Sequence, residues 1–435
     1  MSNLETIAVI DAGGRGAALV DGYGKSEKTA KIIVVPGNDL MALNLPSVVA
    51  FSRRPFELKA QNRGKIVDTL RGQATLVDVC QDDMVECGLV DALSAAHIPV
   101  VGPVREAGRI EWDKPWARQF MKEEGIAHPA FHVFDNEEAG IAFVRAHPET
   151  QWVIKAAGLA LGKGVEVASN TDEAVEGIKK IQKYGKTYVI EERLFGEEFS
   201  FYAVCDGDDY KMMAGAQDHK RLRDGDEGPN TGGMGCVSNP LILTPDILSQ
   251  VDDILAKTFD GMRKRKHPYR GVIYIGGIVC DGKVKVIEFN ARWGDPEAEV
   301  IVPGMRTDLL EVSRAVTEKR VRNLRIDMDT KVRVAVALAS AGYPDTSTKG
   351  KEIFGIDTAA ARQGVTIYGA GVRMDEARRV FTNGGRVLYV VGEGGNVIEA
   401  RKVAYDAMDC ITVEDGAGQF RKDIGMRDVE RLMKA

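Results

Sequence analysis

A polar segment between residues 217 and 235 concentrates side chains that could bind an anionic ligand. Its polar members stand among glycines and include Asp218, Lys220, Asn230 and Thr231. Lysine binds carboxylates and phosphates through charge-assisted hydrogen bonds. Because long polar segments inside a compact domain are usually binding loops or lids, we predict an exposed binding loop here. The alternative is a salt-bridged surface loop that binds no ligand.

A second candidate site lies at the end of an expected strand, where Glu288 and Asn290 are two residues apart. Strict alternation would place Val284, Val286, Glu288 and Asn290 on one face. Carboxylate and amide oxygens suit Mg²⁺, or Mn²⁺, which completes its shell with water and phosphate. A solvated strand end is the alternative. The charged and rigid run that follows, residues 292–297, favours a site.

The glycine-rich segment 158–164 joins two expected strands, 152–155 and 165–168. Glycines let backbone N–H groups approach phosphate oxygens, and Lys163 adds positive charge. The segment is not a P-loop, because GxxxxGK[ST] requires Ser or Thr where Gly164 stands. The alternative is a structural turn without a ligand.

A run of glutamates follows the next expected strand, and Glu191 and Glu198 could bond the hydroxyls of an adenosine. The alternative is a solvated face. His219 has no accompanying Ser or Cys motif, so the sequence gives no support for a catalytic triad.

Composition favours small-molecule partners. The 435 residues are 44% apolar and 28% charged, and the net charge of -6 argues against nucleic-acid binding. No apolar run approaches the roughly 18 residues of a membrane span, and the first residues do not resemble a signal peptide. The six cysteines form no CxxC pair, so neither disulfides nor a zinc site is indicated. We expect a cytoplasmic protein, with a monomer as the working expectation.

Several structural units must position these residues. A strand over 6–12 followed by the turn 13–16 predicts a βα unit, and further apolar runs predict an open parallel sheet over roughly the first 105 residues. The turn matches a dinucleotide fingerprint only weakly. An amphipathic helix near residue 112 begins another unit. The Asp281-Gly282 pair predicts a two-residue hairpin within 272–290. Residues from about 331 predict a separate α+β unit.

In this order, the segments resemble the glycinamide ribonucleotide synthetase family of the ATP-grasp superfamily. The family run DHKR followed by DGDxGPNTGGMG matches residues 218–235, and EFNxRxGDPE matches 288–297. The family elements GGRV and RKDIG match 384–387 and 421–425. The resemblance covers essentially the whole chain.

The resemblance implies a multidomain fold of α/β and α+β type. Its parts would be an N-terminal parallel-sheet pre-ATP-grasp domain over 1–108, an ATP-grasp domain over 109–328 and a small C-terminal α+β domain over 329–435. A mobile lid would occupy about 122–190. ATP would lie between the lid and the central part of the chain.

The resemblance also implies roles for individual residues. Those expected at ATP are Lys114, Lys155, Gly162, Lys163, Gly164, Val165, Glu191, Leu194 and Glu198. Those expected at the other substrates are Gly14, Asn38, Asp82, Asp218, Lys220, Asn230, Thr231, Arg292 and Asp295. Arg292, Lys155, Asp218 and Lys220 would act in the reaction, and Glu288 and Asn290 would hold Mg²⁺ or Mn²⁺.

The implied activity joins glycine to 5-phosphoribosylamine at the expense of ATP, in purine synthesis. Two N-terminal turns depart from the family pattern. GGREHA is replaced by residues 13–18, which lack its Glu and His, and a GPE turn is replaced by residues 80–82. Altered turns leave open a related ligase with a different amine. A catalytically silent nucleotide-binding homologue is a further alternative, which the retained Lys155, Glu288 and Arg292 argue against.

Overall fold

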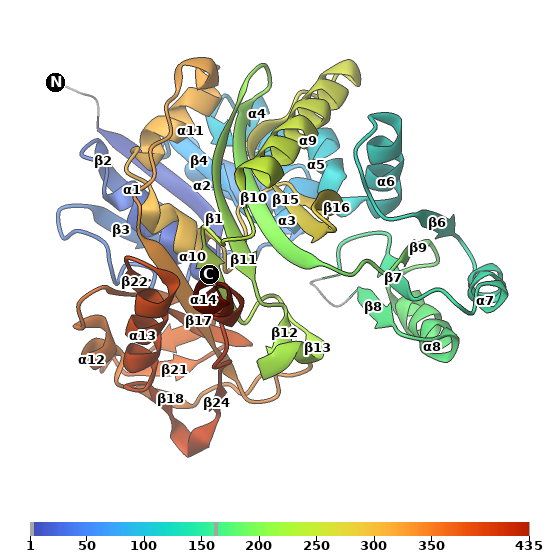
Figure 1. Cartoon of the computed structure of the whole chain (residues 1–435). Coiled ribbons are helices and arrows are strands. Elements are labelled where there is room, and N and C mark those ends of the chain that lie inside the picture. Colours follow the sequence, from blue (N-terminus) through green and yellow to red (C-terminus); the bar gives the residue numbers. More distant parts are fainter. Residues whose placement is uncertain (1–3, 161–163, 435) are drawn as a thin grey trace.

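The computed structural model describes residues 4–160 and 164–434 (Figure 1). Its N-terminal part is a five-stranded parallel sheet in the order β3-β2-β1-β4-β5. The strands are β1 (Glu5–Asp11), β2 (Thr29–Pro36), β3 (Ala50–Arg53), β4 (Leu76–Val79) and β5 (Val100–Val101). The helices are α1 (Gly14–Gly24), α2 (Arg63–Leu70), α3 (Asp82–Glu86), α4 (Leu89–Ala95) and α5 (Arg105–Trp112). The predicted parallel sheet is confirmed.

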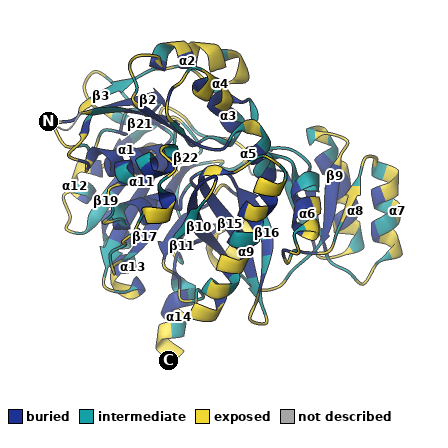
Figure 2. Cartoon of the chain, turned by 90° about the horizontal axis from the view of Figure 1, so that it is seen from above, coloured by how far each residue is buried: buried dark blue, intermediate teal, exposed yellow. Residues whose placement is uncertain are grey.

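A small unit projects to one side of the molecule in Figures 1 and 2. Its four-stranded sheet has the order β6-β9-β7-β8 and carries two helices, α7 and α8. The bounds are α6 (Lys114–Glu123), which precedes it, β6 (Phe131–Phe134), α7 (Glu137–Ala146), β7 (Trp152–Ala156), β8 (Val165–Ala168), α8 (Thr171–Ile181) and β9 (Tyr188–Glu192). It has its own apolar core, which includes Val144, Trp152 and Ile178. We call β6–β9 with α7 and α8 the lid.

The rest of the chain is built around a nine-stranded sheet. Eight strands follow the order β16-β15-β10-β11-β14-β17-β22-β19, and the ninth, β24, pairs with β17. Its strands are β10 (Glu197–Asp206), β11 (Tyr210–Asp218), β14 (Gly235–Ser238), β15 (Arg270–Cys280), β16 (Lys283–Asn290), β17 (Val332–Ser340), β19 (Val365–Gly369), β22 (Arg386–Gly394) and β24 (Gly418–Gln419). The predicted C-terminal α+β unit is present, and it is joined to the central part because β17 pairs directly with β14. One sheet therefore runs through the central and C-terminal parts.

Helices and a small second sheet cover this large sheet, and Figure 2 shows buried strands beneath helices with exposed outer faces. The helices are α9 (Pro245–Lys264), α10 (Ala298–Ile301), α11 (Leu309–Thr317), α12 (Ile356–Ala360), α13 (Val397–Met408) and α14 (Met426–Lys434). The small sheet consists of β18 (Glu352–Phe354), β20 (Val372–Met374), β21 (Val380–Thr382) and β23 (Thr412–Val413).

A β-bulge interrupts β16 just before the candidate metal ligands. Gly277 pairs with Val286 and Gly276 pairs with Glu288, which leaves Ile287 as the extra residue. The prediction that Val284 and Val286 share a face with Glu288 was therefore wrong. Residues 284, 286 and 289 belong to the core beneath α9, whereas Glu288 and Asn290 face a cavity. An extra residue reverses the alternation of side chains beyond it.

The polar segment 217–235 is more ordered than a loop. It completes β11, forms the hairpin β12 (Arg221–Arg223) and β13 (Glu227–Asn230), and then enters β14. His219 is buried, and its Nε2 accepts a hydrogen bond of 3.2 Å from the Gly425 backbone N–H. Burial, with the nearby Arg421 adding to it, lowers the pKa of His219 to about 4, so the ring is neutral. The prediction of an exposed loop holds only for the hairpin.

The predicted hairpin at Asp281-Gly282 is confirmed, with Cys280 paired to Lys283 across it. Asp281 and Gly282 both have positive φ, of 49° and 74°, as a type I′ turn requires. All six cysteines are free thiols. Within the ranges that the structure describes, no helix is long and apolar enough to cross a membrane.

Candidate active site

A cavity of about 1270 Å³ lies where the N-terminal sheet, the lid and the large sheet meet. It brings together nearly all the site residues that the sequence predicted. The predicted residues that line it are Asn38, Asp82, Lys114, Lys155, Gly164, Val165, Glu191, Leu194, Glu198, Asp218, Lys220, Asn230, Thr231, Glu288, Asn290, Arg292 and Asp295. Gly162 and Lys163 lie outside the described residues.

Gly14 does not line this cavity. It is the first residue of α1 and is buried, and a Cβ at its position would lie 2.4 Å from the Tyr389 ring and 2.5 Å from Glu299 Oε1. The absence of a side chain at residue 14 thus permits close packing of α1 against α10 and β22. The prediction that Gly14 contacts substrate is corrected to a packing role.

Lys155 is held at the cavity by an acid on the neighbouring lid strand. Its Nζ lies 2.8 Å from Glu191, which also accepts two hydrogen bonds, of 2.6 and 2.8 Å, from Arg118. Burial would raise the pKa of Glu191, but Lys155 and Arg118 lower it below its usual value. Because both cations engage its carboxylate, Glu191 positions Lys155.

Arg118, on α6, also connects the lid to the bulge in β16. Its Nη1 donates to Val286 O at 3.2 Å, and its Nη2 donates to Ile287 O at 2.5 Å. Lys155 Nζ lies 3.4 Å from the same Ile287 carbonyl. The bulge leaves this carbonyl without a strand partner, and two lid-side cations satisfy it. Nothing in the sequence distinguishes Arg118 from other arginines of an amphipathic helix.

Lys114 stands at the start of α6, beside the glycine-rich segment. Its Nζ donates to Gly158 O at 2.8 Å, and its backbone N–H donates to Ala157 O at 2.9 Å. Burial lowers the pKa of Lys114, an effect that Glu288 opposes. The start of the segment is thereby tied to the base of the lid.

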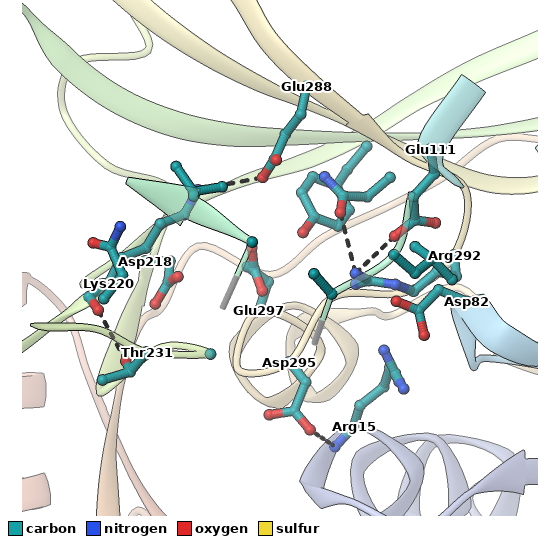
Figure 3. Close-up of a pocket in the computed structure, with 18 of the residues that line it drawn as sticks. Arg15, Asp82, Glu111, Asp218, Lys220, Thr231, Glu288, Arg292, Asp295 and Glu297 are labelled. Carbon is teal, nitrogen blue, oxygen red and sulfur yellow. Dashed lines mark hydrogen bonds and ion pairs between the residues drawn. The ribbon is translucent and has the colours of Figure 1, made fainter. Parts of the chain in front are cut away.

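Glu288 and Asn290 present oxygen atoms to the cavity from the end of β16. Glu288 lies 3.3 Å from Lys220 Nζ, which reaches it from the connection between β11 and β12 (Figure 3). Burial would raise the pKa of Glu288, but Lys220, Lys155 and Lys114 lower it to about 2. The carboxylate is therefore ionised at neutral pH.

These two residues fit a metal ion that also has phosphate and water ligands. Over residues 4–160 and 164–434, no group of three His, Cys, Asp or Glu side chains could hold a metal without other ligands. Asn290 Oδ1 accepts a 3.1 Å hydrogen bond from Arg292, and its Nδ2 is buried without a partner. One carboxylate and one amide oxygen match the small number of protein ligands that Mg²⁺ commonly takes beside phosphates.

Arg292 is fixed by Glu111, a residue that sequence reasoning missed. The two side chains form an ion pair of 2.8 Å, and Glu111 also accepts a 2.8 Å hydrogen bond from the Ala291 backbone N–H (Figure 3). Burial raises the pKa of Glu111, which Arg292 partly offsets. Glu111 is the next-to-last residue of α5, a helix that gave no separate signal in the sequence.

Two neighbouring acids from different parts of the chain, Asp218 and Glu297, lie in the cavity wall. Burial and the neighbouring Glu297 raise the pKa of Asp218 well above its usual value. Glu297 is buried and accepts a 3.0 Å hydrogen bond from Ser200. Thr231 Oγ1 donates to Lys220 O at 2.9 Å and accepts from the Gly233 N–H, so it shapes the turn. Glu297 was missed, although it closes the run EFNxRxGDPE.

Comparison with known proteins agrees with this geometry. Three family models match in order: the N domain of phosphoribosylglycinamide synthetase over residues 5–111, its ATP-grasp (A) domain over 112–298 and its C domain over 333–427. A phosphoribosylamine--glycine ligase of Ralstonia nicotianae is 38% identical over 98% of this chain and 100% of its own length. The chain belongs to the phosphoribosylglycinamide synthetase family.

A solved structure and a longer relative extend the comparison. The crystal structure of phosphoribosylamine--glycine ligase from Thermotoga maritima matches with a TM-score of 0.79 and 32% identity, covering 96% of this chain and all of that one. The trifunctional purine biosynthetic protein adenosine-3 of Drosophila melanogaster is 37% identical over 97% of this chain. The chain spans only 32% of that relative's length.

In this family member, Asp295 joins three parts of the chain at the cavity floor. It lies 3.2 Å from Arg386, accepts a hydrogen bond from Tyr389, and lies 3.5 Å from the Arg15 backbone N–H. Burial would raise the pKa of Asp295, but Arg386 and Arg15 lower it. Arg15 was missed; Arg386 lies in the GGRV run.

Asn38 and Asp82, the two remaining N-terminal candidates, differ in how far their side chains already bond to other groups of the protein. Asn38 Nδ2 donates to Ala12 O and Gly369 O, at 3.0 and 2.8 Å, and its Oδ1 accepts from the Leu40 N–H at 3.0 Å. Its amide is thus used within the protein and shapes the cavity wall. Asp82 begins α3 and lies near Arg292 in Figure 3, and it contributes to the raised pKa of that arginine.

Proposed function

We propose that this protein is an ATP- and Mg²⁺-dependent carboxylate-amine ligase. It joins glycine to 5-phosphoribosylamine through a glycyl phosphate and releases glycinamide ribonucleotide, ADP and phosphate, a step of de novo purine synthesis. The observation that carries the proposal is the charge arrangement of one cavity. Lys114, Lys155 and Lys220 surround the ionised Glu288, and Arg292 stands two residues beyond the other candidate ligand.

The first step requires strong charge neutralisation, because a carboxylate must approach a triphosphate. An oxygen of the glycine carboxylate attacks the γ-phosphorus, and the bond to the bridging oxygen of ADP breaks. Lys155, Lys114 and Arg292 all line the cavity, and in this proposal their charges neutralise the phosphates. Fixed cations of this kind supply most of the catalysis in phosphoryl transfer.

Mg²⁺ or Mn²⁺ is the proposed metal, with Glu288 and Asn290 as its protein ligands. When bound, the ion would neutralise charge on the phosphate oxygens. Arg292 already orients Asn290 by donating to Oδ1. The low pKa of Glu288 keeps its carboxylate available as a ligand over the whole neutral range.

The second step transfers the glycyl group to the amine. The amine nitrogen attacks the carbonyl carbon, and the carbon–oxygen bond to phosphate breaks. The proton that the amine loses goes to the leaving phosphate. An acyl phosphate hydrolyses when water reaches it. Closure of the lid over the cavity would exclude water during both steps.

A second candidate is the same chemistry with a different amine. It is favoured by the changed turns at residues 13–18 and 80–82, which border the side of the cavity opposite the lid. A silent nucleotide-binding protein is not favoured, because it would have no need for Lys155, Glu288 and Arg292 together.

One assay separates these functions. Phosphate release from ATP is measured with glycine and freshly generated phosphoribosylamine, and then with each omitted or replaced by other amines. We expect release only when glycine and phosphoribosylamine are both present. Turnover with another amine alone would overturn the purine assignment, and no turnover under any condition would support the silent homologue.

The proposed partners are therefore small molecules: ATP, glycine and the amine. The net charge of -6 gives no support to nucleic-acid binding. The proposed location is the cytoplasm, consistent with six free thiols. A monomer is proposed, since one chain supplies every wall of the cavity described above.

A further inference from the structure

The structure accounts for the glutamate that is missing from the first turn. The family pattern GGREHA has Glu where this chain has Gly16. A Cβ on Gly16 would lie 2.8 Å from Asp11 Cβ and 3.0 Å from Asp11 Oδ2. Its third neighbour, Met41 Cε at 2.8 Å, is the end of a flexible side chain. Asp11 thus fills the space in which a side chain at residue 16 would begin.

Asp11 supplies a carboxylate to Arg15 in that space. Arg15 Nε lies 3.1 Å from Oδ2, and Arg15 Nη2 lies 3.0 Å from Oδ1, so the pair is bidentate. Asp11 is fully buried, Arg15 is 6% exposed, and Gln81 also donates to the carboxylate. A buried guanidinium without such a partner would be strongly destabilised.

The same arginine reaches the segment that carries Arg292. Arg15 Nη1 donates to Trp293 O at 2.9 Å, and the Arg15 backbone N–H faces Asp295. Figure 3 shows Arg15 and Asp295 together, on the side of the cavity where Asp82 and Arg292 also lie. A chain of contacts therefore runs from Asp11, at the end of β1, through Arg15 to the residues that flank Arg292.

We propose that Asp11 is a positioning residue that replaces the glutamate of GGREHA. Its carboxylate holds Arg15 against residues 293–295 and thereby sets the amine-side wall of the cavity relative to Arg292. The carboxylate has moved five positions along the chain, from a helix to the end of the preceding strand. This inference rests on the proposed function, because the amine-side wall has a role only if an amine is bound there.

A simple packing role for Asp11 gives a different expectation. If only volume mattered, an apolar or amide side chain of similar size would serve as well, and a carboxylate returned to residue 16 would bring no benefit. If the carboxylate matters, its position is exchangeable as long as it reaches Arg15. Exchange of the two positions therefore separates the two roles.

The experiment compares Asp11→Asn, Asp11→Gly and the double variant Asp11→Gly with Gly16→Glu in the full-length enzyme. KM for glycine, ATP and phosphoribosylamine is measured for each, with kcat. We expect Asp11→Asn and Asp11→Gly to raise the phosphoribosylamine KM roughly tenfold to a hundredfold, because misplacement of about 1 Å has effects of this size. The KM for glycine and ATP should change less than about twofold. The double variant should recover most of the loss.

Wild-type turnover with glycine and phosphoribosylamine is the first control, since its absence would count against the proposed function itself. With that activity present, an unchanged amine KM in Asp11→Asn would overturn the inference. A folded double variant no better than Asp11→Gly would also overturn it. If Asp11→Gly does not fold and the added Gly16→Glu restores both folding and the amine KM, the exchange is supported. If neither Asp11→Gly nor the double variant folds, Asp11→Asn, which keeps the side-chain shape, decides the case.

Discussion

The lid-facing and amine-facing sides of the cavity are built in different ways. On the lid side, Lys155 and Glu191 lie on the paired lid strands β7 and β9, and Glu288 lies on β16 of the large sheet. Their motifs are retained in the sequence. On the amine side, Arg15 and Asp82 lie in the first turns of helices α1 and α3, and Asp295 lies in a turn after β16. These positions are far apart in the chain, and the sequence departs from the family pattern around Arg15 and Asp82. Phosphoryl transfer imposes the same charge arrangement on every substrate pair, whereas the wall around the amine is shaped by whichever residues meet there.

The largest expected effect tests the lid side. Glu288→Gln removes the charge that would hold the metal, so turnover should fall by at least ~10²-fold. Steady-state phosphate release at saturating glycine measures it. Lys283→Gln, an exposed change at the start of the same strand, is the matched control and should leave turnover nearly unchanged. Near wild-type turnover in Glu288→Gln would refute the assigned role.

Arg118→Met tests how the lid is attached to the base. The variant removes a buried ion-pair partner of Glu191, and the free energy of unfolding should fall by about 2–3 kcal/mol. This is less than the usual cost of removing one partner of a buried ion pair, because Lys155 remains paired with Glu191. Chemical denaturation followed by fluorescence measures the shift. Lys180→Met, which breaks an exposed pair with Glu166, should change stability by less than about 1 kcal/mol. Equal effects of the two variants would contradict this account.

The pH dependence of stability tests the polar segment between the two sides. The His219 pKa is about 4 in the folded protein, below the usual value near 6.5, so the unfolded chain binds a proton more readily. Stability is therefore complete above about pH 6.5 and is lost as the pH falls toward 4. His219→Gln should reduce the loss between pH 7 and 5 by about 1–2 kcal/mol. If the free energies of unfolding of the wild type and the variant fall equally between pH 7 and 5, the assignment to His219 is wrong.

The smallest expected effect belongs to the amine side. Asp82→Asn removes one charge near Arg292 without breaking a direct ion pair, so we expect the phosphoribosylamine KM to rise about fivefold and the ATP KM to stay constant. Asp68→Asn, an exposed acid of the same domain, is the control. A larger change in the ATP KM than in the amine KM would remove the distinction between the two sides of the cavity.

Much of the fold followed from local patterns, and the exceptions have physical reasons. Apolar runs and the Asp281-Gly282 turn predicted the parallel sheet and the hairpin correctly, because each depends on neighbours in sequence. The pairing of β14 with β17 joins residues about a hundred positions apart and leaves no local trace. Strict alternation failed at Ile287 because a bulge depends on the partner strand.

The candidate site divides in the same way. Residues inside dense motifs, such as Glu288, Asn290 and Arg292, were predicted because several polar types stand together. Arg118 and Glu111 were not, because each is an isolated charged residue of an amphipathic helix whose importance comes from a partner elsewhere. Gly14 was misassigned because its neighbours Tyr389 and Glu299 are distant in the chain.

The bulge in β16 gives two functions to neighbouring residues. Because Ile287 is the extra residue, Glu288 still pairs opposite Gly276 and faces the cavity, while the Ile287 carbonyl accepts a hydrogen bond from Arg118 and lies 3.4 Å from Lys155 Nζ. Deleting Ile287 would leave Glu288 and Asn290 on the cavity face of a regular strand, but it would remove the carbonyl that these two cations share. The change would therefore weaken the attachment of the lid to the base of the cavity and leave the candidate metal ligands in place.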